Sequence, residues 1–439
     1  MNIISPASTA VLKIASRFIK TGTEYRISKY CVDYRVDDGV LLFNVLTREL
    51  LLLTSSEYDN LDKMDYLKKQ LFMIPTNTDE KSIASVCKSF VLSQRKDLST
   101  ITGYTIFPTT DCNARCFYCF EKGRSVSSMS ENMAQSVVEF IKRHCANKKV
   151  TFRWFGGEPL MNPKAIDIIC SGLRDAGIEY VSNMVSNGYL FTDELIEKAS
   201  SLWNLSAVQI TLDGTEDVYN RVKAYVNSSG SAYERVISNI EKLTKASIRV
   251  FIRMNMDLYN AADLLDLSKH LAVRFSGNQF IRSYPHHIFK EGVPMGEMHS
   301  DAEWEKRDFA IAQIEKVLVD AGIYKVKSLS VNPRTAHCMA DSGSAITILP
   351  DGHIGLCEHY SESEFIGHVD SDEFDKSVIS RWRELVDEIP ECNDCFFYPD
   401  CVMLKKCTNS TVCYPQLRAS HLRKTKAKMH QLYEQWKSK

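Results

Sequence analysis

Fourteen cysteines in a chain of 439 residues are the feature most able to do chemistry. They are unevenly placed, with three inside one eight-residue window and seven between Cys338 and Cys413. None lies between Cys170 and Cys338. A secreted disulfide scaffold would be short and cross-linked throughout, whereas clustered cysteines in a long chain without a signal peptide indicate metal binding. We therefore expect a protein of the reducing cytoplasm.

The first cluster, Cys112, Cys116 and Cys119, forms a C-x3-C-x2-C loop directly after a predicted strand, Tyr104–Pro108. A cubane [4Fe–4S] cluster needs one ligand per iron, so three thiolates leave one iron open to a substrate or cofactor. A zinc ion is the alternative, but it would require a fourth Cys or His close by, and this loop contains none. The spacing therefore favours an iron–sulfur cluster with an open iron.

This loop resembles the C-x3-C-x-aromatic-C signature of the radical S-adenosylmethionine (SAM) superfamily, with Tyr118 at the aromatic position. The resemblance implies that the open iron binds the amino and carboxylate groups of SAM. It also implies that an electron from the cluster splits a sulfonium C–S bond, and that the 5′-deoxyadenosyl radical abstracts hydrogen from a substrate. The cofactor then supplies the chemistry, and the protein orients and shields it. A low-potential donor of flavodoxin or ferredoxin type is the expected electron source.

Short motifs at the ends of later predicted strands match the same family. Glycines let the backbone approach a ligand closely, and barrel active sites lie at the carboxyl ends of strands. Gly156-Gly157-Glu158-Pro159 resembles the motif that meets the SAM amino group, and the Ser-Asn-Gly segment resembles one near the ribose. An ordinary turn or surface role is the alternative for each. The predicted SAM contacts are Tyr118, Gly156, Gly157, Glu158, Ser186, Asn187, Gln209, Thr211 and Arg221.

The second cysteine group resembles the SPASM domain, which is attached to radical SAM enzymes that modify peptides and proteins. It departs from that family at one interval, since five residues precede Cys407 where the family has three, and Lys405 stands at the expected cysteine. A zinc ribbon is the alternative interpretation. The group reads Cys338-x13-Gly352-x4-Cys357, then Cys392-x2-Cys395-x5-Cys401-x5-Cys407-x5-Cys413.

The resemblance implies two auxiliary [4Fe–4S] clusters, and thus three clusters in all. One would be held by Cys392, Cys395, Cys401 and Cys413, and the other by Cys338, Cys357 and Cys407. Because the second set has three thiolates, we expect either an open iron or a fourth ligand. The candidates are His337, His353, His359, a carboxylate or the substrate.

Glu358 directly follows Cys357 and is the predicted catalytic residue. In protein-modifying relatives a carboxylate at this position acts as general base, and a base beside a cluster could be tuned for proton removal. An ordinary surface glutamate is the alternative, and His359 is a second candidate for the base.

From Tyr104 onward the predicted strands and helices alternate, which indicates βαβ units and a parallel sheet. Six units fit an open partial barrel. We therefore predict an α/β fold with a partial (β/α)6 barrel at residues 99–324 and a SPASM domain with a C-terminal helix at residues 325–439. The predicted strands are Tyr104–Pro108, Val150–Phe155, Ile178–Val185, Ala207–Leu212, Arg249–Met254 and Arg274–Ile281.

Residues 1–98 are predicted to form a winged-helix-like α+β domain with three strands followed by three short helices. This order is similar to the peptide-recognition domain of enzymes that mature ribosomally made peptides. Such domains bind a leader peptide as an extra strand on an exposed sheet edge. The expected edge strand is Glu49–Thr54. A domain that only caps the barrel is the alternative.

Charge and hydropathy give no sign of nucleic-acid or membrane partners. Lys and Arg total 54 against 55 Asp and Glu, so no basic surface is indicated. No apolar run reaches the length of roughly 20 residues that a membrane span needs. Ala10–Ile19 is interrupted by Lys13 and Arg17, which favours an amphipathic helix over a signal peptide.

These features predict a radical SAM/SPASM enzyme that abstracts hydrogen from a ribosomally made precursor peptide with a leader. The expected product is an intramolecular cross-link, carbon–carbon as in streptide-type synthases or thioether as in sactipeptide-type enzymes. An anaerobic sulfatase maturase forming formylglycine is the first alternative. A non-catalytic, metal-bound peptide carrier is the second, and the intact cysteine loop and Gly-Gly-Glu motif argue against it.

Overall fold

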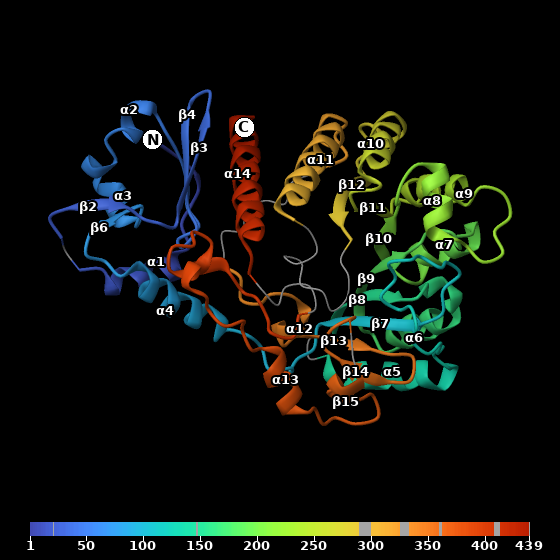
Figure 1. The fold of residues 1–439 in the computed structure, drawn as a ribbon. Coiled ribbons are helices and arrows are strands. Elements are labelled where there is room, and N and C mark those ends of the chain that lie inside the picture. The colour runs from blue at the N-terminus through green and yellow to red at the C-terminus, as the bar shows by residue number, and fades with distance from the viewer. Residues whose placement is uncertain are drawn as a thin grey trace.

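The computed structural model describes residues 1–20, 22–145, 148–288, 300–324, 333–359, 362–407 and 413–438. These residues form sheets of nine, four and two strands, with α-helices packed around them. The nine-stranded sheet runs through the radical SAM-like and C-terminal regions (Figure 1). The two smaller sheets belong to the N-terminal region, drawn in blue. The structure is therefore α/β with a mostly parallel main sheet.

Six parallel strands make up most of the large sheet, in the order β12-β11-β10-β9-β8-β7. Because neighbours in space are neighbours in sequence and all run the same way, the carboxyl ends of the six strands meet at one edge. The motifs predicted to bind the cofactor gather there. The strands are β7 (Gly103–Thr109), β8 (Lys149–Gly156), β9 (Glu179–Ser186), β10 (Leu205–Thr211), β11 (Arg249–Met256) and β12 (Ile281–His287).

Side chains alternate between the two faces of this sheet, as the pleat of a strand requires. In β8, Phe152 and Trp154 are buried against the helical layer, while Arg153 between them is exposed on the other face. The helices that follow the strands cover the apolar face and leave a polar inner face. They are α5 (Glu131–His144), α6 (Pro163–Asp175), α7 (Asp193–Ser201), α8 (Glu216–Lys223), α9 (Ala232–Lys245), α10 (Ala261–Phe275) and α11 (Asp301–Asp320).

The C-terminal region extends the same sheet. Strand β13 (Ala345–Ile348) pairs parallel with β7, and β14 (His353–Gly355) and β15 (Gly367–His368) continue antiparallel. Two short helices, α12 (Met339–Ser342) and α13 (Lys376–Trp382), flank these strands. The strand that leads into the first cysteine loop is thus held between β8 and β13.

The N-terminal region contains six strands where three were predicted. Tyr25–Val36 is divided, because Ser28 and the Lys29 amide turn toward the buried carboxylate of Glu80. Strands β1 and β6 were not foreseen. The strands are β1 (Asn2–Ser5), β2 (Tyr25–Ile27), β3 (Cys31–Val36), β4 (Gly39–Asn44), β5 (Leu50–Leu53) and β6 (Met73–Pro75). The helices are α1 (Thr9–Ala15), α2 (Ser55–Tyr58), α3 (Asp65–Lys69) and α4 (Glu80–Leu92).

The expected edge strand Glu49–Thr54 is wrong in its position. In the four-stranded sheet the order is β1-β5-β4-β3, so β1 covers the outer side of β5. Both faces of β4 and β5 are also buried, which explains their nearly continuous leucine runs. Within the described residues, the edges of this sheet are β1 and β3.

Two further predictions need correction. The sixth parallel strand is Ile281–His287, seven residues beyond the predicted start at Arg274, because α10 continues its apolar face from Leu271 to Phe275. Helix α8 was not predicted at all. Most of the loop expected at Tyr284–Ser300 lies outside the described residues, and its first part belongs to β12.

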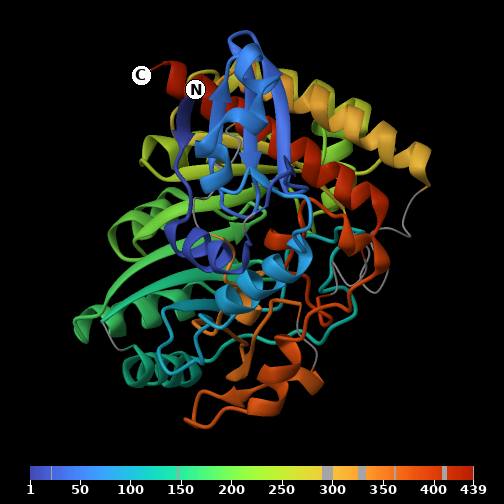
Figure 2. The ribbon, with the colours of Figure 1, turned by 90° about the vertical axis from the view of Figure 1, so that its left-hand side faces the viewer.

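Helix α14 (Pro415–Lys437) lies between the N-terminal sheet and α11 (Figures 1 and 2). Its Met429 and Tyr433 are buried in the core of the N-terminal region. Tyr433 donates a hydrogen bond to Asp38, and Arg423 pairs with Asp308 of α11 at 2.8 Å. The helix therefore joins the N-terminal region to the main sheet. No described helix has the length and apolar character needed to traverse a bilayer.

Candidate active site

The first cysteine loop begins at the carboxyl end of β7 and lies directly against the Gly156–Gly157 turn that ends β8. Gly156 has φ of +120°, and a Cβ there would stand 2.2 Å from the carbonyl oxygen of Thr109. A Cβ on Gly157 would stand 2.2 Å from that of Asp111. The backbones approach so closely that only glycine fits at either position. This contact fixes the residue that precedes Cys112.

The other side of the loop is tied to the end of α8. The Arg115 amide donates to the carbonyl of Lys223, and the Val226 amide donates to that of Asn113, each at 2.8 Å. Two chain segments therefore clamp the loop from opposite sides. A loop held in this way already positions its cysteines, so the loop would not have to become ordered when a cluster binds.

The three thiols of the loop lie near enough to one another to interact electrostatically. Burial raises the pKa of Cys112 to about 12, and the nearby Cys116 and Cys119 add to this rise. The Ala114 amide donates to the Cys112 sulfur at 3.4 Å, and the side-chain amide of Asn187 lies 3.9 Å from it. Three neighbouring thiols with N–H donors directed at sulfur fit an iron–sulfur cluster, which takes one thiolate per iron and whose potential such donors tune.

Glu158 joins the ends of β8 and β9. Its carboxylate is fully buried and accepts hydrogen bonds from Ser186 Oγ at 2.9 Å, the Asn187 amide at 2.7 Å and the Leu160 amide at 3.2 Å. Burial raises its pKa to about 7, although these donors oppose the shift. The side-chain amide of Asn187 also donates to Asn113 in the cysteine loop at 2.6 Å. The structure thus brings the Gly-Gly-Glu and Ser-Asn motifs together beside the loop.

A buried lysine, Lys223, lies next to the loop and was not among the site residues predicted from the sequence. Lys223 pairs with Asp213 at 2.9 Å and donates to Thr211 Oγ1 at 2.6 Å and to the Tyr118 hydroxyl at 3.2 Å. Tyr118 in turn donates to Asp213 at 2.8 Å. Burial lowers the pKa of Lys223, but the Asp213 carboxylate, together with the nearby Cys116, Tyr118 and Tyr219, outweighs that effect and holds the pKa well above its usual value.

The structure does not bring Arg221 to the site. Arg221 is exposed, whereas Tyr219, Val222 and Lys223 share the buried face of α8. Two residues of a helix correspond to about 200° of rotation, so Arg221 and Lys223 point in nearly opposite directions. The spacing of the apolar residues Tyr219 and Val222 marks the buried face of the helix, and this pattern could have identified Lys223 as a buried residue on the same face.

The inner face of β10, β11 and β12 carries polar side chains. Tyr284 donates to Gln209 at 2.8 Å, and Arg253 contacts Asn255 and His286, each at 2.9 Å. Burial lowers the pKa of Arg253, and the carboxylate of Glu358 is one of the nearby negative charges that oppose this shift. Glu358, from the C-terminal region, therefore lies near enough to Arg253 on the inner side of the sheet to interact with it electrostatically.

The C-terminal cysteines separate into two sets, as the SPASM resemblance implies. Burial raises the pKa of Cys401 to about 11, with contributions from Cys395, Cys413 and Cys392. This set lies against α4, whose Lys88 opposes the shift at Cys401. In the described part of the chain, no three His, Cys, Asp or Glu side chains converge on the position of a single metal ion.

The second set consists of Cys338, Cys357 and Cys407, so the structure places Cys407 with the predicted partners despite its shifted spacing. Burial raises the pKa of Cys357, and Glu358, Cys338 and Cys407 raise it further. The ring of His359 packs on Phe120, just after the first cysteine loop, at 4.4 Å between centroids. This set is therefore adjacent to the first loop.

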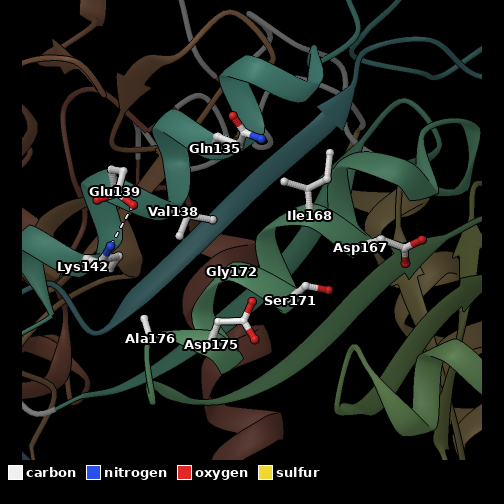
Figure 3. A pocket seen from close by; sticks show the side chains of 10 residues that line it. All are labelled: Gln135, Val138, Glu139, Lys142, Asp167, Ile168, Ser171, Gly172, Asp175 and Ala176. Carbon is white, nitrogen blue, oxygen red and sulfur yellow. Dashed lines mark hydrogen bonds and ion pairs between the residues drawn. The ribbon is translucent and has the colours of Figure 1, made fainter.

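A surface groove of about 550 Å³ between α5 and α6 lies apart from these groups (Figure 3). Its wall comes from those two helices and the residue after α6, and includes the Glu139–Lys142 pair. None of the predicted site residues lines it.

Residues 106–271 match the Radical SAM superfamily. The chain therefore contains a radical SAM domain. A GTP 3′,8-cyclase of Clostridium perfringens is 24% identical over 263 residues, covering 57% of this chain and 79% of that protein. A cysteine-type anaerobic sulfatase-maturating enzyme of Clostridium novyi is 22% identical over 323 residues, covering 67% of this chain and 84% of that protein.

Two solved structures share the fold. Native anSMEcpe with bound AdoMet superimposes with a TM-score of 0.58 at 15% identity. The match covers 77% of this chain and 99% of the anSMEcpe chain. Streptococcus suis SuiB bound to S-adenosylmethionine gives a TM-score of 0.54 at 11% identity, covering 86% of this chain and 94% of its own. The second match covers more of this chain than the first does.

Replacing Lys223 by Met should lower the free energy of unfolding by about 3–5 kcal/mol, because it leaves the buried Asp213 carboxylate without its cation. Arg221→Met, on the exposed side of the same helix, should change it by less than about 0.5 kcal/mol. Urea unfolding followed by circular dichroism would measure both. Adding Asp213→Asn to Lys223→Met should recover much of the loss. Equal effects of the two single variants would contradict this assignment of the helix faces.

Proposed function

We propose that this enzyme reductively cleaves SAM and abstracts hydrogen from a ribosomally made precursor peptide, installing an intramolecular carbon–carbon or thioether cross-link. The observation that carries the proposal is the adjacency of two groups. The first cysteine loop lies against the Gly-Gly turn, and the set with Cys338, Cys357 and Cys407 stands beside it with Glu358 facing the inner sheet. We infer three [4Fe–4S] clusters, with residues 99–324 as a partial (β/α)6 barrel and 325–439 as a SPASM domain.

When bound, SAM and the cluster supply C–S bond cleavage and the radical that takes a hydrogen atom. Cys112, Cys116 and Cys119 would hold three irons and leave the fourth open. Gly156 and Gly157 would present backbone to SAM, and Ser186, Asn187, Gln209 and Thr211 would line its site. Lys223 lies beside the loop, whereas Arg221, a predicted SAM contact, is exposed on the opposite side of α8. A flavodoxin or ferredoxin would supply the electron.

Glu358 is proposed as the base that takes a proton from the substrate radical as the new bond forms. Its position supports this role, because it faces both the inner sheet and the second cysteine set. Loss of one electron and one proton converts the substrate radical into a closed-shell product. A cluster held by the adjacent cysteines would take the electron.

Peptide substrates are supported by two structural neighbours. SuiB has been solved with the precursor peptide SuiA, and anSMEcpe with the Cp18Cys peptide. We propose that residues 1–98 are a winged-helix-like peptide-recognition domain. An extended peptide can add to a free strand edge, and among the described strands only β4 pairs with the six residues of β3.

Formylglycine formation on a sulfatase is the second candidate. It is favoured by the Clostridium novyi relative, whose match spans 67% of this chain. A short peptide gene next to the gene for this chain would support cross-linking, and a sulfatase gene would support the alternative.

The proposed chemistry is tested by metal content and SAM cleavage. Anaerobically reconstituted protein should bind about twelve iron and twelve sulfide, four per cluster. With dithionite it should convert SAM to 5′-deoxyadenosine. Replacing Cys112, Cys116 and Cys119 by Ala should remove about a third of the iron and abolish the product. Stoichiometric zinc with little iron, or no 5′-deoxyadenosine from the iron-loaded protein, would overturn the proposal.

Glu358→Gln should retain all clusters and still form 5′-deoxyadenosine, but the cross-linking rate should fall about 10²–10⁴-fold, the usual contribution of a general base. Mass spectrometry of the peptide and chromatography of SAM products would separate the two effects. Glu373→Gln, an exposed glutamate of the same region, is the control and should behave like the wild type. Normal cross-linking by Glu358→Gln would assign the base elsewhere, with His359 next to be tested.

Peptide recognition can be tested without removing the N-terminal region, whose core α14 shares. The two-residue turn places Val36 opposite Gly39, so the amide of Arg35 points away from β4. Arg35→Pro should weaken peptide binding about fivefold to tenfold, whereas Arg35→Ala, which keeps the amide, should not. Fluorescence anisotropy with peptides from neighbouring open reading frames would measure this. If neither Arg35→Pro nor deletion of residues 2–5 changed the peptide affinity, then neither edge of the sheet, β3 or β1, would be the peptide-binding site.

A further inference from the structure

His337 lies at the second cysteine set, immediately before Cys338. Its ring nitrogen Nε2 stands 3.9 Å from the sulfur of Cys407, which is the cysteine farthest from it in sequence within that set. The ring thus reaches from the first cysteine of the set toward the last. In this set three thiolates would leave one corner of a cubane without a protein ligand.

The other nitrogen of this ring is held by the backbone. Nδ1 is hydrogen-bonded to the carbonyl oxygen of Val402. Since a carbonyl only accepts, Nδ1 carries the proton, and in the neutral ring the lone pair is on Nε2, which faces Cys407. Histidine ligands of metals are usually oriented in this way, with the distal N–H donated to a carbonyl or carboxylate.

A buried ion pair fixes the backbone that carries His337 and Cys338. Asp341 accepts from the amides of both residues, each at 3.0 Å. Its carboxylate is fully buried and pairs with Arg95 at 2.6 Å. The two neighbouring side chains are therefore presented from one rigid turn, as adjacent ligands of a cluster would have to be.

The other histidine candidates for the open corner have partners of their own. The ring of His359 packs on Phe120, and His353 lies 3.0 Å from Asp351 and stacks on Phe365. Glu358 lies near Cys357 as well as near Arg253, and it is proposed above as the base. The ring of His337 is directed at a sulfur of this set.

We propose that Nε2 of His337 is the fourth protein ligand of the cluster held by Cys338, Cys357 and Cys407, which makes it a Cys3His cluster. The proposal rests on the proposed function, because it requires an iron–sulfur cluster at this set. A neutral imidazole in place of a thiolate removes one negative charge from the cluster and raises its reduction potential, as histidine ligation does in Rieske centres. A higher potential suits a cluster that accepts an electron from a substrate radical.

Pulsed EPR on reduced protein containing ¹⁵N-histidine tests the ligand directly. The experiment uses the Cys112, Cys116 and Cys119→Ala background, which removes the SAM cluster and should keep about eight iron. We expect a strongly coupled ¹⁵N that disappears in His337→Ala and persists in His359→Ala. His337→Cys should keep the iron and lose the coupling, which guards against a variant that merely fails to fold.

Three results would overturn the assignment. They are no strong nitrogen coupling, coupling that survives in His337→Ala, or only the weak coupling of a histidine hydrogen-bonded to a cysteine sulfur. If the background variant instead holds zinc or no iron at all, the proposed function fails as well. If the background variant holds about eight iron but shows no histidine coupling, His337 is not a ligand, whereas the proposal of two auxiliary clusters stands.

Discussion

The parallel pairing of β7 with both β8 and β13 is the constraint on which the rest of the molecule depends. β8 delivers the two glycines that fix the start of the cysteine loop, and β13 attaches the C-terminal region to the same sheet. Because one strand has both neighbours, the loop and the second cysteine set cannot move independently. The distance between the proposed radical source and the proposed electron acceptor is thereby set by a hydrogen-bonded ladder, which is stiffer than a linker.

Charge is distributed around the cysteine sets in a consistent way. Buried thiolates repel one another, and each of two sets has cations close by. Lys223 lies at the first loop, and Lys88 and Arg418 lie at the set ending in Cys413. The set with Cys338 differs, since its near neighbours include Asp341 and Glu358. Extra negative charge there makes a neutral ligand such as His337 electrostatically more acceptable than a fourth thiolate.

The sequence located the cysteine and glycine motifs more reliably than the outline of the fold. Cysteine spacing and glycines at strand ends are local signals, because a loop of eight residues has few ways to surround a cluster. Five of the six parallel strands were placed within a few residues. The sixth failed because the polar inner face of β12 hides its alternation, and β1 failed because four residues carry too little periodicity. Lys223 was missed because a buried lysine is recognised only once its helix face is known.

Helix α14 begins two residues after Cys413, the last cysteine of its set, and its far end is packed into the N-terminal core. A cysteine proposed to bind a cluster is thus separated from a docking helix by only a short segment. If a cluster is bound at this set, the start of the helix is held in place, and loss of the cluster would leave it freer to move. Iron supply would then affect how often the C-terminal helix detaches, so the protein in an iron-starved cell would be more open to proteases than in an iron-replete one.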